Sequence, residues 1–404
     1  MKILLLNQAF YPDVVATSQY LSELAVALAG RGHQVTVITG RRAYDNPENI
    51  FARTEFWRGI QIIRVHSTGL GKNSKWRRAL NFSSFMLSCT ARVTVLPRQD
   101  VVLALTSPPL ISVLGAMLTR FRGSRFFYWV MDFNPDEAIA AGWLRADSLV
   151  AKVLDSLSRF SLRQATGIIA LDQFMRDRIM SKGIRPDKIA VLPPWSQDSH
   201  VRFDPHGRNR FRKLHGLEEK FVVMYSGNHS PCHPLDTVLE AARRLAGNRE
   251  IVFLFVGGGS RFAQVKQFAD QHQLSNIVCL PYQPMDQLAG ALSAADLHLV
   301  VMGNPFVGLV HPCKIYNILL VGSPLLYIGP RPSHISEILD KLNGEPSCAV
   351  AEHGQVERVI HHILDLKQAA PAHDRGHDLP LAERFSKSVL LPQLVATLEL
   401  AASA

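Results

Sequence analysis

The chain has 404 residues, which is more than one ordinary hydrophobic core accommodates and predicts two or three domains. Hydrophobic residues make up 47% and charged residues 19% of it, which excludes a disordered or fibrous protein. Its five cysteines form no CxxC pair, which argues against a zinc site or a disulfide framework and favours a reducing, cytoplasmic setting.

The formal net charge of +10 is concentrated in the first third of the chain. Residues 1–130 contain 16 Lys and Arg against 6 Asp and Glu, whereas the remaining residues hold 28 of each. This excess could attract nucleic acid, an anionic membrane or a phosphorylated substrate, or it could be an ordinary basic surface. Because no helix-turn-helix, aromatic RNP pattern or zinc finger accompanies it, we expect no nucleic-acid partner.

Apolar runs and helical periodicity alternate from the start of the chain. KILLLNQ (2–8) predicts a buried strand rather than a signal peptide, because an amphipathic helix over 18–29 follows it instead of a cleavage site. A second strand over 32–39 completes a β-α-β unit. Further continuous apolar runs, typical of parallel strands covered on both faces, lie at 61–66, 100–105, 125–132 and 167–171.

A second series of strands and helices begins at residue 220. Strands are expected at 220–227, 250–259, 276–281, 296–302 and 323–329. The fold class is therefore α/β, with two Rossmann-like domains whose parallel sheets face each other across a cleft. The expected parts are an N-terminal domain (1–193), a proline-rich linker (194–219), a C-terminal domain (220–380) and a C-terminal helix that packs back towards the N-terminal domain (381–404).

Two glycine-containing loops follow strands of the second domain. In GNHSPCHPLDT (227–237), Gly227 permits a close backbone approach and the next helix offers free amide groups, which suits an anion. A simple βα turn without a ligand is the alternative. VGGGS (256–260) lacks the GxGxxG spacing, so nicotinamide or flavin binding is not expected.

A lysine stands at the start of a predicted helix in HPCKIYNILLVGSPLL (311–326). PCKIYN places Lys314 in the first turn of a helix that ends before Gly322. The N-terminus of a helix favours negative charge, so a cation there is repelled unless an anion neutralises both. The position therefore predicts that Lys314 binds phosphate, and a snorkelling surface lysine is the alternative.

The first domain offers carboxylates after the strand in YWVMDFNPDE (128–137). Asp132 is placed to act as a base or to orient a hydroxyl group, whereas Asp136 is expected to cap the next helix. No DxD motif is nearby, and the histidines, including His229, His233 and His311, do not fall at metal-ligand spacing. We therefore expect no metal and no other cofactor.

WRRALNFSSFMLSCTARVTVL (76–96) combines apolar side chains with basic flanks. Its uncharged core, 79–91, is too short to cross a bilayer. The segment could lie in the interface of an anionic membrane, or it could be an ordinary helix packed on the first sheet. Both interpretations hold if one end is exposed.

These loops, in this order, resemble those of the retaining GT-B glycosyltransferases of family 4, especially the branch that makes bacterial exopolysaccharide and O-antigen units. The resemblance covers essentially the whole chain and rests on FYPD, GHQVTVIT, TSPPL, VMDFNPD, IIALDQFMRDRI, YSGNHSPCHPLDTVLEAARRL, FVGGGSRF, LPYQPMDQLAGALSAADLHLV and HPCKIYNILLVGSPLL. It implies that a sugar moves from a UDP-sugar donor to a saccharide or polyprenyl-linked acceptor. The expected location is cytoplasmic, with peripheral contact at the cytoplasmic face of the inner membrane.

The resemblance also implies roles for individual residues. Lys314 would bind the diphosphate and offset the charge on the leaving group, and Asp132 would lie near the sugar and the acceptor. Retention in the family is usually ascribed to front-face attack, which requires no protein nucleophile. The expected substrate contacts are Gly227, Asn228, His229, His233, Gly258, Tyr282, Gln283, His311, Tyr316, Asn317, Thr17 and Ser18.

The chain departs from the family pattern in the second domain. Asn228 and His233 stand where many members have an arginine and a lysine. The usual pair of glutamates is replaced by Leu309 and Asn317, and Val307 stands where near relatives often have a glutamate. These departures leave diphosphate neutralisation to Lys314, helix N-termini and a protonated His233.

The double glycine expected after FYPD is also absent. VVATS replaces it, and Thr17 and Ser18 could cap the helix there and donate to a phosphate. Two other functions are weighed against sugar transfer: a non-catalytic protein that binds a nucleotide sugar or acts as a scaffold, and a nucleotide-sugar 2-epimerase. The second-domain loops lack the carboxylates that the epimerase needs for elimination.

Overall fold

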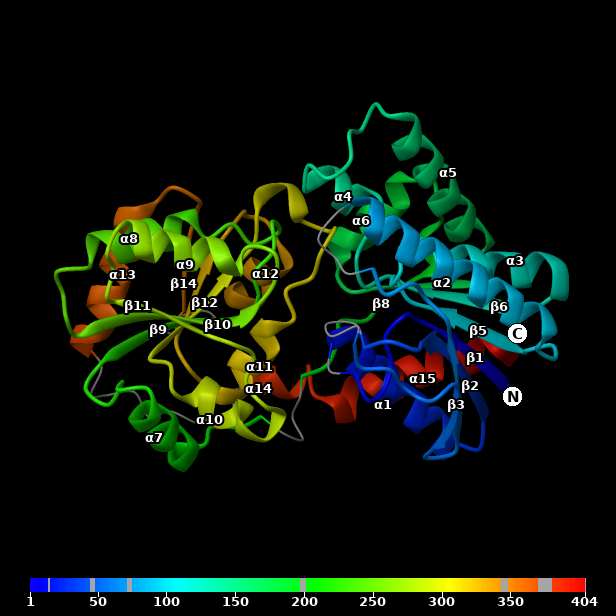
Figure 1. Cartoon of the computed structure of the whole chain (residues 1–404), viewed down its shortest axis with the longest axis horizontal. Coiled ribbons are helices and arrows are strands. Elements are labelled where there is room, and N and C mark those ends of the chain that lie inside the picture. Colours follow the sequence, from blue (N-terminus) through cyan, green and yellow to red (C-terminus); the bar gives the residue numbers. More distant parts are fainter. Residues whose placement is uncertain are drawn as a thin grey trace. The chain divides into compact units, whose positions relative to one another are not determined.

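The computed structural model of the chain describes residues 1–13, 15–43, 48–70, 75–196, 201–342, 348–369 and 380–403. The chain divides into two compact units, each built around a parallel sheet. The first unit comprises Met1–Pro194, Gly308–Val310 and Leu391–Ala404, and the second comprises Trp195–Val307 and His311–Leu390. The prediction of an α/β protein with two parallel-sheet domains is confirmed (Figure 1).

The first sheet has eight strands in the order β3-β4-β2-β1-β5-β6-β7-β8, and all pairs are parallel except β3 with β4. The central strands are almost fully buried, which explains their continuous apolar sequences. The strands are β1 (Lys2–Leu6), β2 (Gln34–Gly40), β3 (Thr54–Trp57), β4 (Ile60–Val65), β5 (Val101–Ala104), β6 (Arg125–Trp129), β7 (Gly167–Ala170) and β8 (Ile189–Val191).

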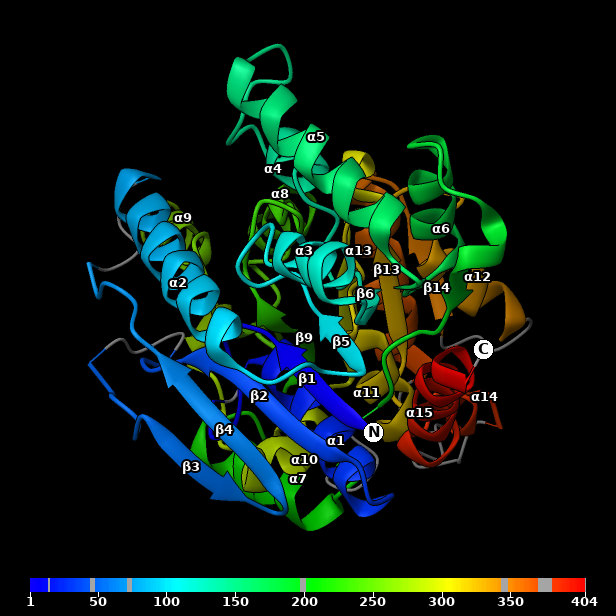
Figure 2. The ribbon, with the colours of Figure 1, turned by 90° about the vertical axis from the view of Figure 1, so that its right-hand side faces the viewer.

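Helices cover both faces of this sheet. Helices α2, α3 and α5 lie on one face, and α1 and α15 lie on the other (Figures 1 and 2). Glu399 of α15 pairs with Arg31 and His33 at 2.7 and 2.8 Å, which fixes the last helix to the end of α1. The helices are α1 (Ala16–Gly30), α2 (Lys75–Val95), α3 (Ser112–Arg122), α4 (Asp136–Ala140), α5 (Leu149–Gln164), α6 (Gln173–Ser181) and α15 (Lys387–Ser403).

The second sheet has six parallel strands in the order β11-β10-β9-β12-β13-β14. The chain runs outward from β9 in one direction and then returns to continue from β12 in the other. This reversal places a topological switch point between β9 and β12, where open α/β sheets bind ligands. The strands are β9 (Phe221–Asn228), β10 (Ile251–Gly258), β11 (Ile277–Leu280), β12 (Leu297–Val301), β13 (Leu325–Ile328) and β14 (Cys348–Ala351).

Two apolar layers cover the second sheet (Figure 1). On one face, α8 (Asp236–Arg244), α9 (Phe262–Gln271) and α13 (Val356–Ala369) pack on the inward side chains of β9 and β10. On the other face, α7, α10 and α11 pack on the alternate side chains of the same strands. The remaining helices are α7 (Pro205–Leu214), α10 (Leu288–Ser293), α11 (Lys314–Val321), α12 (His334–Lys341) and α14 (Pro380–Glu383).

The segment predicted as a linker, 194–219, contains helix α7. Arg212 of α7 is buried and donates to Asp296, which also accepts from Arg208 at 2.9 Å and from the amide of Val222 at 2.7 Å. These charge-assisted bonds attach the helix to the second sheet. None of the helices in the described part of the chain is long and apolar enough to cross a bilayer.

Candidate functional site

Two loops meet at the switch point of the second sheet. The loop after β9 follows Gly227, and the loop after β12 leads to α11. The amide of Gly303 donates to the carbonyl of Cys232 at 2.8 Å, and Nδ1 of His233 lies 2.7 Å from the carbonyl oxygen of Val301. The sheet topology therefore brings together the two segments in which the sequence predicts an anion site.

Lys314 is the first residue of α11, and its side chain points into this junction. The Nζ atom is buried and has no hydrogen-bond partner among the described residues. It lies 3.5 Å from the centroid of the Tyr225 ring, whose hydroxyl group donates to the carbonyl of Asn228 at 2.8 Å. Burial lowers the pKa of Lys314 well below its usual value. The ammonium group is thus poised to gain from a bound anion, which contradicts the surface-lysine alternative.

Glycines make room for the lysine. Gly227 has φ +132°, and a Cβ atom there would lie 3.3 Å from both Cε and Nζ of Lys314. At Gly257 (φ +133°), a Cβ atom would lie 2.1 Å from the carbonyl oxygen of Gly227. The glycines of β9 and β10 are therefore required for the close approach of the two strand ends.

The two histidines of the β9 loop are neutral. Nδ1 of His229 faces the carbonyl oxygens of Gly227 and Gly258 at 3.0 and 3.2 Å, so it carries the hydrogen. Burial, with a smaller effect of Lys314, lowers the pKa of His229 to about 4 and that of His233 to about 3. The prediction that a protonated His233 shares the charge compensation is therefore wrong for the free protein.

Other predicted contacts lie around the same strand ends. Asn228 is exposed, and Asn317 and Gln283 are half-buried. Tyr282 is 56% exposed, and its ring lies so close to Gly258 that a Cβ atom there would be 3.0 Å from Cε2. The structure leaves these side chains near solvent, and their contact with a substrate stays a prediction.

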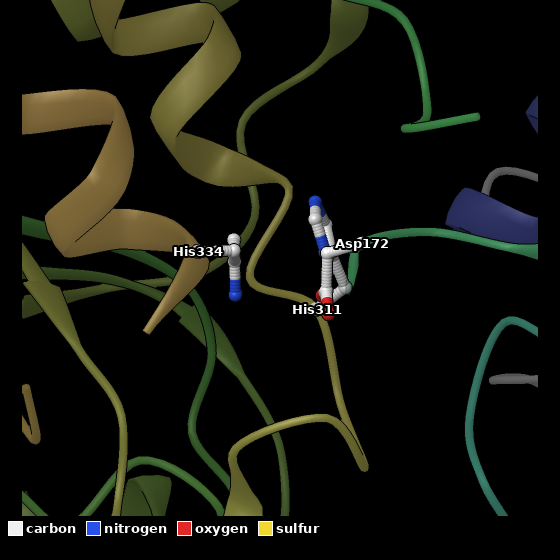
Figure 3. A group of neighbouring side chains, drawn as sticks. All are labelled: Asp172, His311 and His334. Carbon is white, nitrogen blue, oxygen red and sulfur yellow. The ribbon is translucent and has the colours of Figure 1, made fainter. Parts of the chain in front are cut away.

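His311 and Tyr316 have a packing role in the free protein. Tyr316 is 1% exposed, and its hydroxyl group lies 2.6 Å from Nε2 of His311. The ring of His311 also stacks on that of His334, with centroids 3.9 Å apart and planes at 17° (Figure 3). Phe385 covers the other side of Tyr316 at 4.6 Å between centroids. A role of either residue in substrate binding stays a prediction.

His311 and His334 together offer two possible metal ligands. A ring nitrogen of His311 and one of His334 lie within 4.8 Å of each other. Two ligands are fewer than the three or four that protein metal sites use. Figure 3 also draws Asp172, which belongs to the first unit and there caps α6 by accepting from the amide of Met175 at 2.8 Å. The absence of a metal cofactor stays a prediction.

The first unit places Asp132 beyond the carboxyl end of β6. Burial raises the pKa of its carboxyl group to about 6. A carboxyl group with this pKa is mostly ionised at neutral pH and remains basic enough to accept a proton. Asp136 does not cap α4, because Pro135 occupies the N-cap position; Asp136 instead pairs with the buried Lys182 at 2.5 Å.

Thr17 and Ser18 do not cap α1. The helix starts at Ala16, its N-cap is Val15, and no side chain caps it. Ser18 is fully buried, and its hydroxyl group donates to the carbonyl of Asp13 at 2.8 Å. The capping prediction is wrong because the helix begins at Ala16, two residues before the expected start at residue 18, so that both side chains already lie inside its first turn.

Tyr225 is the main site residue that the sequence pattern did not single out. It lies in β9 among continuous apolar residues and is typical there of a core aromatic side chain. In the sequence, only its hydroxyl group and its position two residues before Gly227 indicate that its ring could contact a cation at the site.

Comparisons with known proteins agree with this architecture and site. The family described as "Glycosyl transferase 4-like domain" matches residues 16–195, and the family described as "Glycosyl transferases group 1" matches residues 207–306. The chain belongs to these glycosyltransferases. The predicted resemblance and the predicted enzyme class are thereby confirmed.

Two relatives of this glycosyltransferase are each 25% identical to it. One is named as a colanic acid biosynthesis glycosyl transferase, WcaI of Escherichia coli strain K12, and the match covers 87% of this chain and 89% of the relative. The other is named as a glycosyltransferase, WbjE of Pseudomonas aeruginosa, and the match covers 70% of this chain and 71% of the relative.

Solved structures share the fold of the glycosyltransferase. Sucrose-phosphate synthase from Thermosynechococcus elongatus superposes with a TM-score of 0.77 at 14% identity, covering 100% of both chains. Anabaena HepE in complex with UDP-glucose gives a TM-score of 0.71 at 15% identity, covering 99% of this chain and 100% of HepE. At these identities the likeness shows the GT-B fold alone.

Proposed function

We propose that this glycosyltransferase moves a sugar from a UDP-sugar, with retention of configuration, to a saccharide or polyprenyl-linked acceptor in bacterial surface polysaccharide synthesis. The relative named for colanic acid synthesis and the fold neighbour in complex with UDP-glucose support this substrate class. An N-acetylhexosamine is the donor sugar we favour. The proposed location is the cytoplasmic face of the inner membrane, with peripheral contact.

One observation supports the proposal most strongly. Nζ of Lys314 is buried without a hydrogen-bond partner in the described structure, beside the glycine-lined end of β9 and over the Tyr225 ring. A buried cation without a counter-charge is unfavourable, so a site that keeps one is suited to an anion. The diphosphate of the donor supplies that anion, and Lys314 begins α11, whose N-terminus also favours negative charge.

The roles follow from the charges that develop in the reaction. As the bond between the sugar and the diphosphate breaks, negative charge grows on the leaving oxygen. Lys314 and the α11 N-terminus stabilise it, an effect typically worth 10²–10³ in rate for one donor. Asp132 orients the acceptor hydroxyl group, and the departing phosphate takes the acceptor proton. No metal and no protein nucleophile is required.

The test is release of UDP from candidate UDP-sugars in the presence of a bacterial membrane extract as acceptor source. We expect release by the wild type and its loss in Lys314→Ala. Lys213→Ala changes an exposed lysine of α7 and serves as the matched control. Full release by Lys314→Ala would contradict the proposal.

A non-catalytic, nucleotide-sugar-binding protein is the second candidate. The residues Asn228, His233 and Leu309, at positions where the family pattern has charged side chains, favour it. The same assay separates the two: binding of UDP-sugar without release, across donors and extracts, would favour the non-catalytic role. A 2-epimerase would instead interconvert the free UDP-sugar without any acceptor.

A further inference from the structure

Helix α2 has an apolar surface on the side that faces solvent. Phe85 and Cys89 are fully buried and attach the helix to the first unit. On the opposite side, Trp76, Leu80 and Leu87 are 58%, 47% and 72% exposed. A helix packed on a sheet by one face normally presents polar side chains on the other, so this second apolar face is unusual.

The exposed side chains form one continuous stripe. Positions 76, 80, 83, 87, 91 and 94 recur at three or four residues and therefore share a helix face. All six are exposed and none is charged. The α2 stripe is thus Trp76, Leu80, Ser83, Leu87, Ala91 and Thr94.

Helix α3 extends the apolar surface at the end of α2. The guanidinium group of Arg122 donates to the carbonyl oxygens of Leu96 and Thr94, which holds the end of α2 beside the end of α3. Phe121, which precedes Arg122 in α3, is 75% exposed and adds an apolar side chain to this surface. Both helices lie on the same face of the first sheet (Figure 2).

The part of the sequence that holds α2 and α3 carries almost only positive charges. Residues 66–131 contain nine Lys and Arg and a single acidic residue, Asp100. Arg77 and Arg120 are exposed, and Cζ of Arg77 lies 5.3 Å from the centroid of the Trp76 ring. An uncharged stripe with three large apolar side chains, set in a basic part of the chain, is complementary to a surface with an apolar interior and negative headgroups.

We propose that the α2 stripe lies in the interface of an anionic lipid bilayer, parallel to its surface, with Trp76, Leu80 and Leu87 inserted among the acyl chains. Tryptophan prefers this interfacial depth, and the flanking arginines contact lipid phosphates. The inference rests on the proposed function for its purpose, because a polyprenyl-linked acceptor is presented at such a surface. Its physical basis, exposure and charge, is independent of sugar transfer.

The experiment measures binding of the full chain to vesicles of phosphatidylcholine with and without phosphatidylglycerol, in the absence of donor. We expect binding to the anionic vesicles that decreases with added salt. The triple variant Trp76→Ser, Leu80→Ser, Leu87→Ser should bind about 50-fold more weakly, because it removes the inserted apolar surface. Its UDP-induced thermal shift should equal that of the wild type, which shows that the fold and donor site are intact.

A second triple variant is the matched control. Phe56→Ser, Leu214→Ser and Leu400→Ser remove side chains that are 76%, 74% and 73% exposed and lie outside α2. This control should bind vesicles like the wild type. Equal binding by both triple variants and the wild type, or a wild type that binds no vesicle, would overturn the proposal. The proposal would also be overturned if the wild type formed a dimer that binds no vesicle and the α2 variant were a monomer, since the stripe would then contact a second copy of the chain.

Discussion

Nζ of Lys314 lies 3.5 Å from the centroid of the Tyr225 ring. A cation–π contact of this kind stabilises a buried cation by about 2 kcal/mol, whereas removing the cation from water costs several kcal/mol. The ring therefore compensates only part of the desolvation of Lys314. The rest of this desolvation cost lowers the free energy of unfolding of the free protein. A bound diphosphate would offset it.

Replacing Lys314 by methionine should stabilise the free protein. The variant Lys314→Met removes a buried charge that has no hydrogen-bond partner in the described structure. We expect the free energy of unfolding in urea to rise by about 1–3 kcal/mol while UDP release is lost. Lys182→Met is the matched control, because Lys182 is also a lysine with a buried amino group but pairs with Asp136 and Asp155. That variant should lose about 1–3 kcal/mol, because it removes the cation from two partly exposed carboxylates, and an equal loss in Lys314→Met would contradict this prediction.

Adding a methyl group at Gly227 should weaken donor binding. The Cβ atom would lie 3.3 Å from Nζ of Lys314, and the backbone there has φ +132°, which side chains rarely adopt. We expect Gly227→Ala to raise the dissociation constant for UDP at least about tenfold, as measured by calorimetry. Gly247→Ala is the control, because nothing lies within 4 Å of a Cβ atom at that position. Unchanged affinity in Gly227→Ala would show that the β9 loop does not contact the nucleotide.

Asp132 should give the enzyme an acidic limb in its pH profile. Burial raises the pKa of its carboxyl group to about 6, so the ionised form, which we propose orients the acceptor, is lost as the pH falls through this value. We expect kcat/KM of the wild type to fall below about pH 6. Asp132→Asn should lose about 10²–10³ in kcat/KM and lack this limb. An unchanged acidic limb in Asp132→Asn would assign it to another group.

The raised pKa of Asp132 should affect stability in the opposite direction to activity: as the pH rises, activity should increase and folding stability should decrease. The unfolded carboxyl group ionises near its usual pKa of 3.8, whereas the folded one keeps its proton up to about 6. The wild type therefore loses stability as the pH rises through this window, and Asp132→Asn does not. At neutral pH we expect Asp132→Asn to be about 1–2 kcal/mol more stable in urea unfolding. The exposed Asp187→Asn is the control and should change little.

The histidines of the β9 loop should remain neutral well below pH 6. Burial lowers the pKa of His229 to about 4 and that of His233 to about 3. In NMR spectra, the ring signals that disappear in His229→Gln and His233→Gln should not shift between neutral pH and about pH 5. Because the unfolded histidines bind protons from their usual pKa of 6.5 downward, these two groups should lower folding stability as the pH falls. Titration of either signal near 6.5 would refute the buried, neutral assignment.

The strand pattern could be predicted because most strands are buried on both faces. Each predicted strand overlaps an observed one, with ends that differ by a few residues, and continuous apolar runs such as those of β5 and β12 leave little choice of structure. The strands that were not predicted are β3, β8 and β14. They lie at sheet edges and are partly exposed, so their sequences do not form such runs. Helix α7 was not predicted because its sequence is rich in charge and its attachment depends on Asp296, far along the chain.

The site could be predicted only in part, because its geometry depends on contacts between distant segments. The sequence placed Lys314 at a helix start and Gly227 at a strand end, and the structure brings them together. It could not show that Tyr225 lies under Lys314, or that burial keeps His233 neutral. Nor could the sequence show that the ring of Tyr316, in the first turn of α11, is buried in the free protein. Its contact with a substrate stays a prediction.

The most direct test of the account is the thermal shift that UDP produces in the wild type and in Lys314→Ala. Saturating UDP should stabilise the wild type by about 2.7 kcal/mol at a hundred times the dissociation constant, while uridine, which lacks the diphosphate, should have little effect. Lys314→Ala should show little response to UDP, and Lys213→Ala should respond like the wild type. If UDP stabilises Lys314→Ala as much as the wild type, the diphosphate does not bind at this lysine and the central claim is wrong.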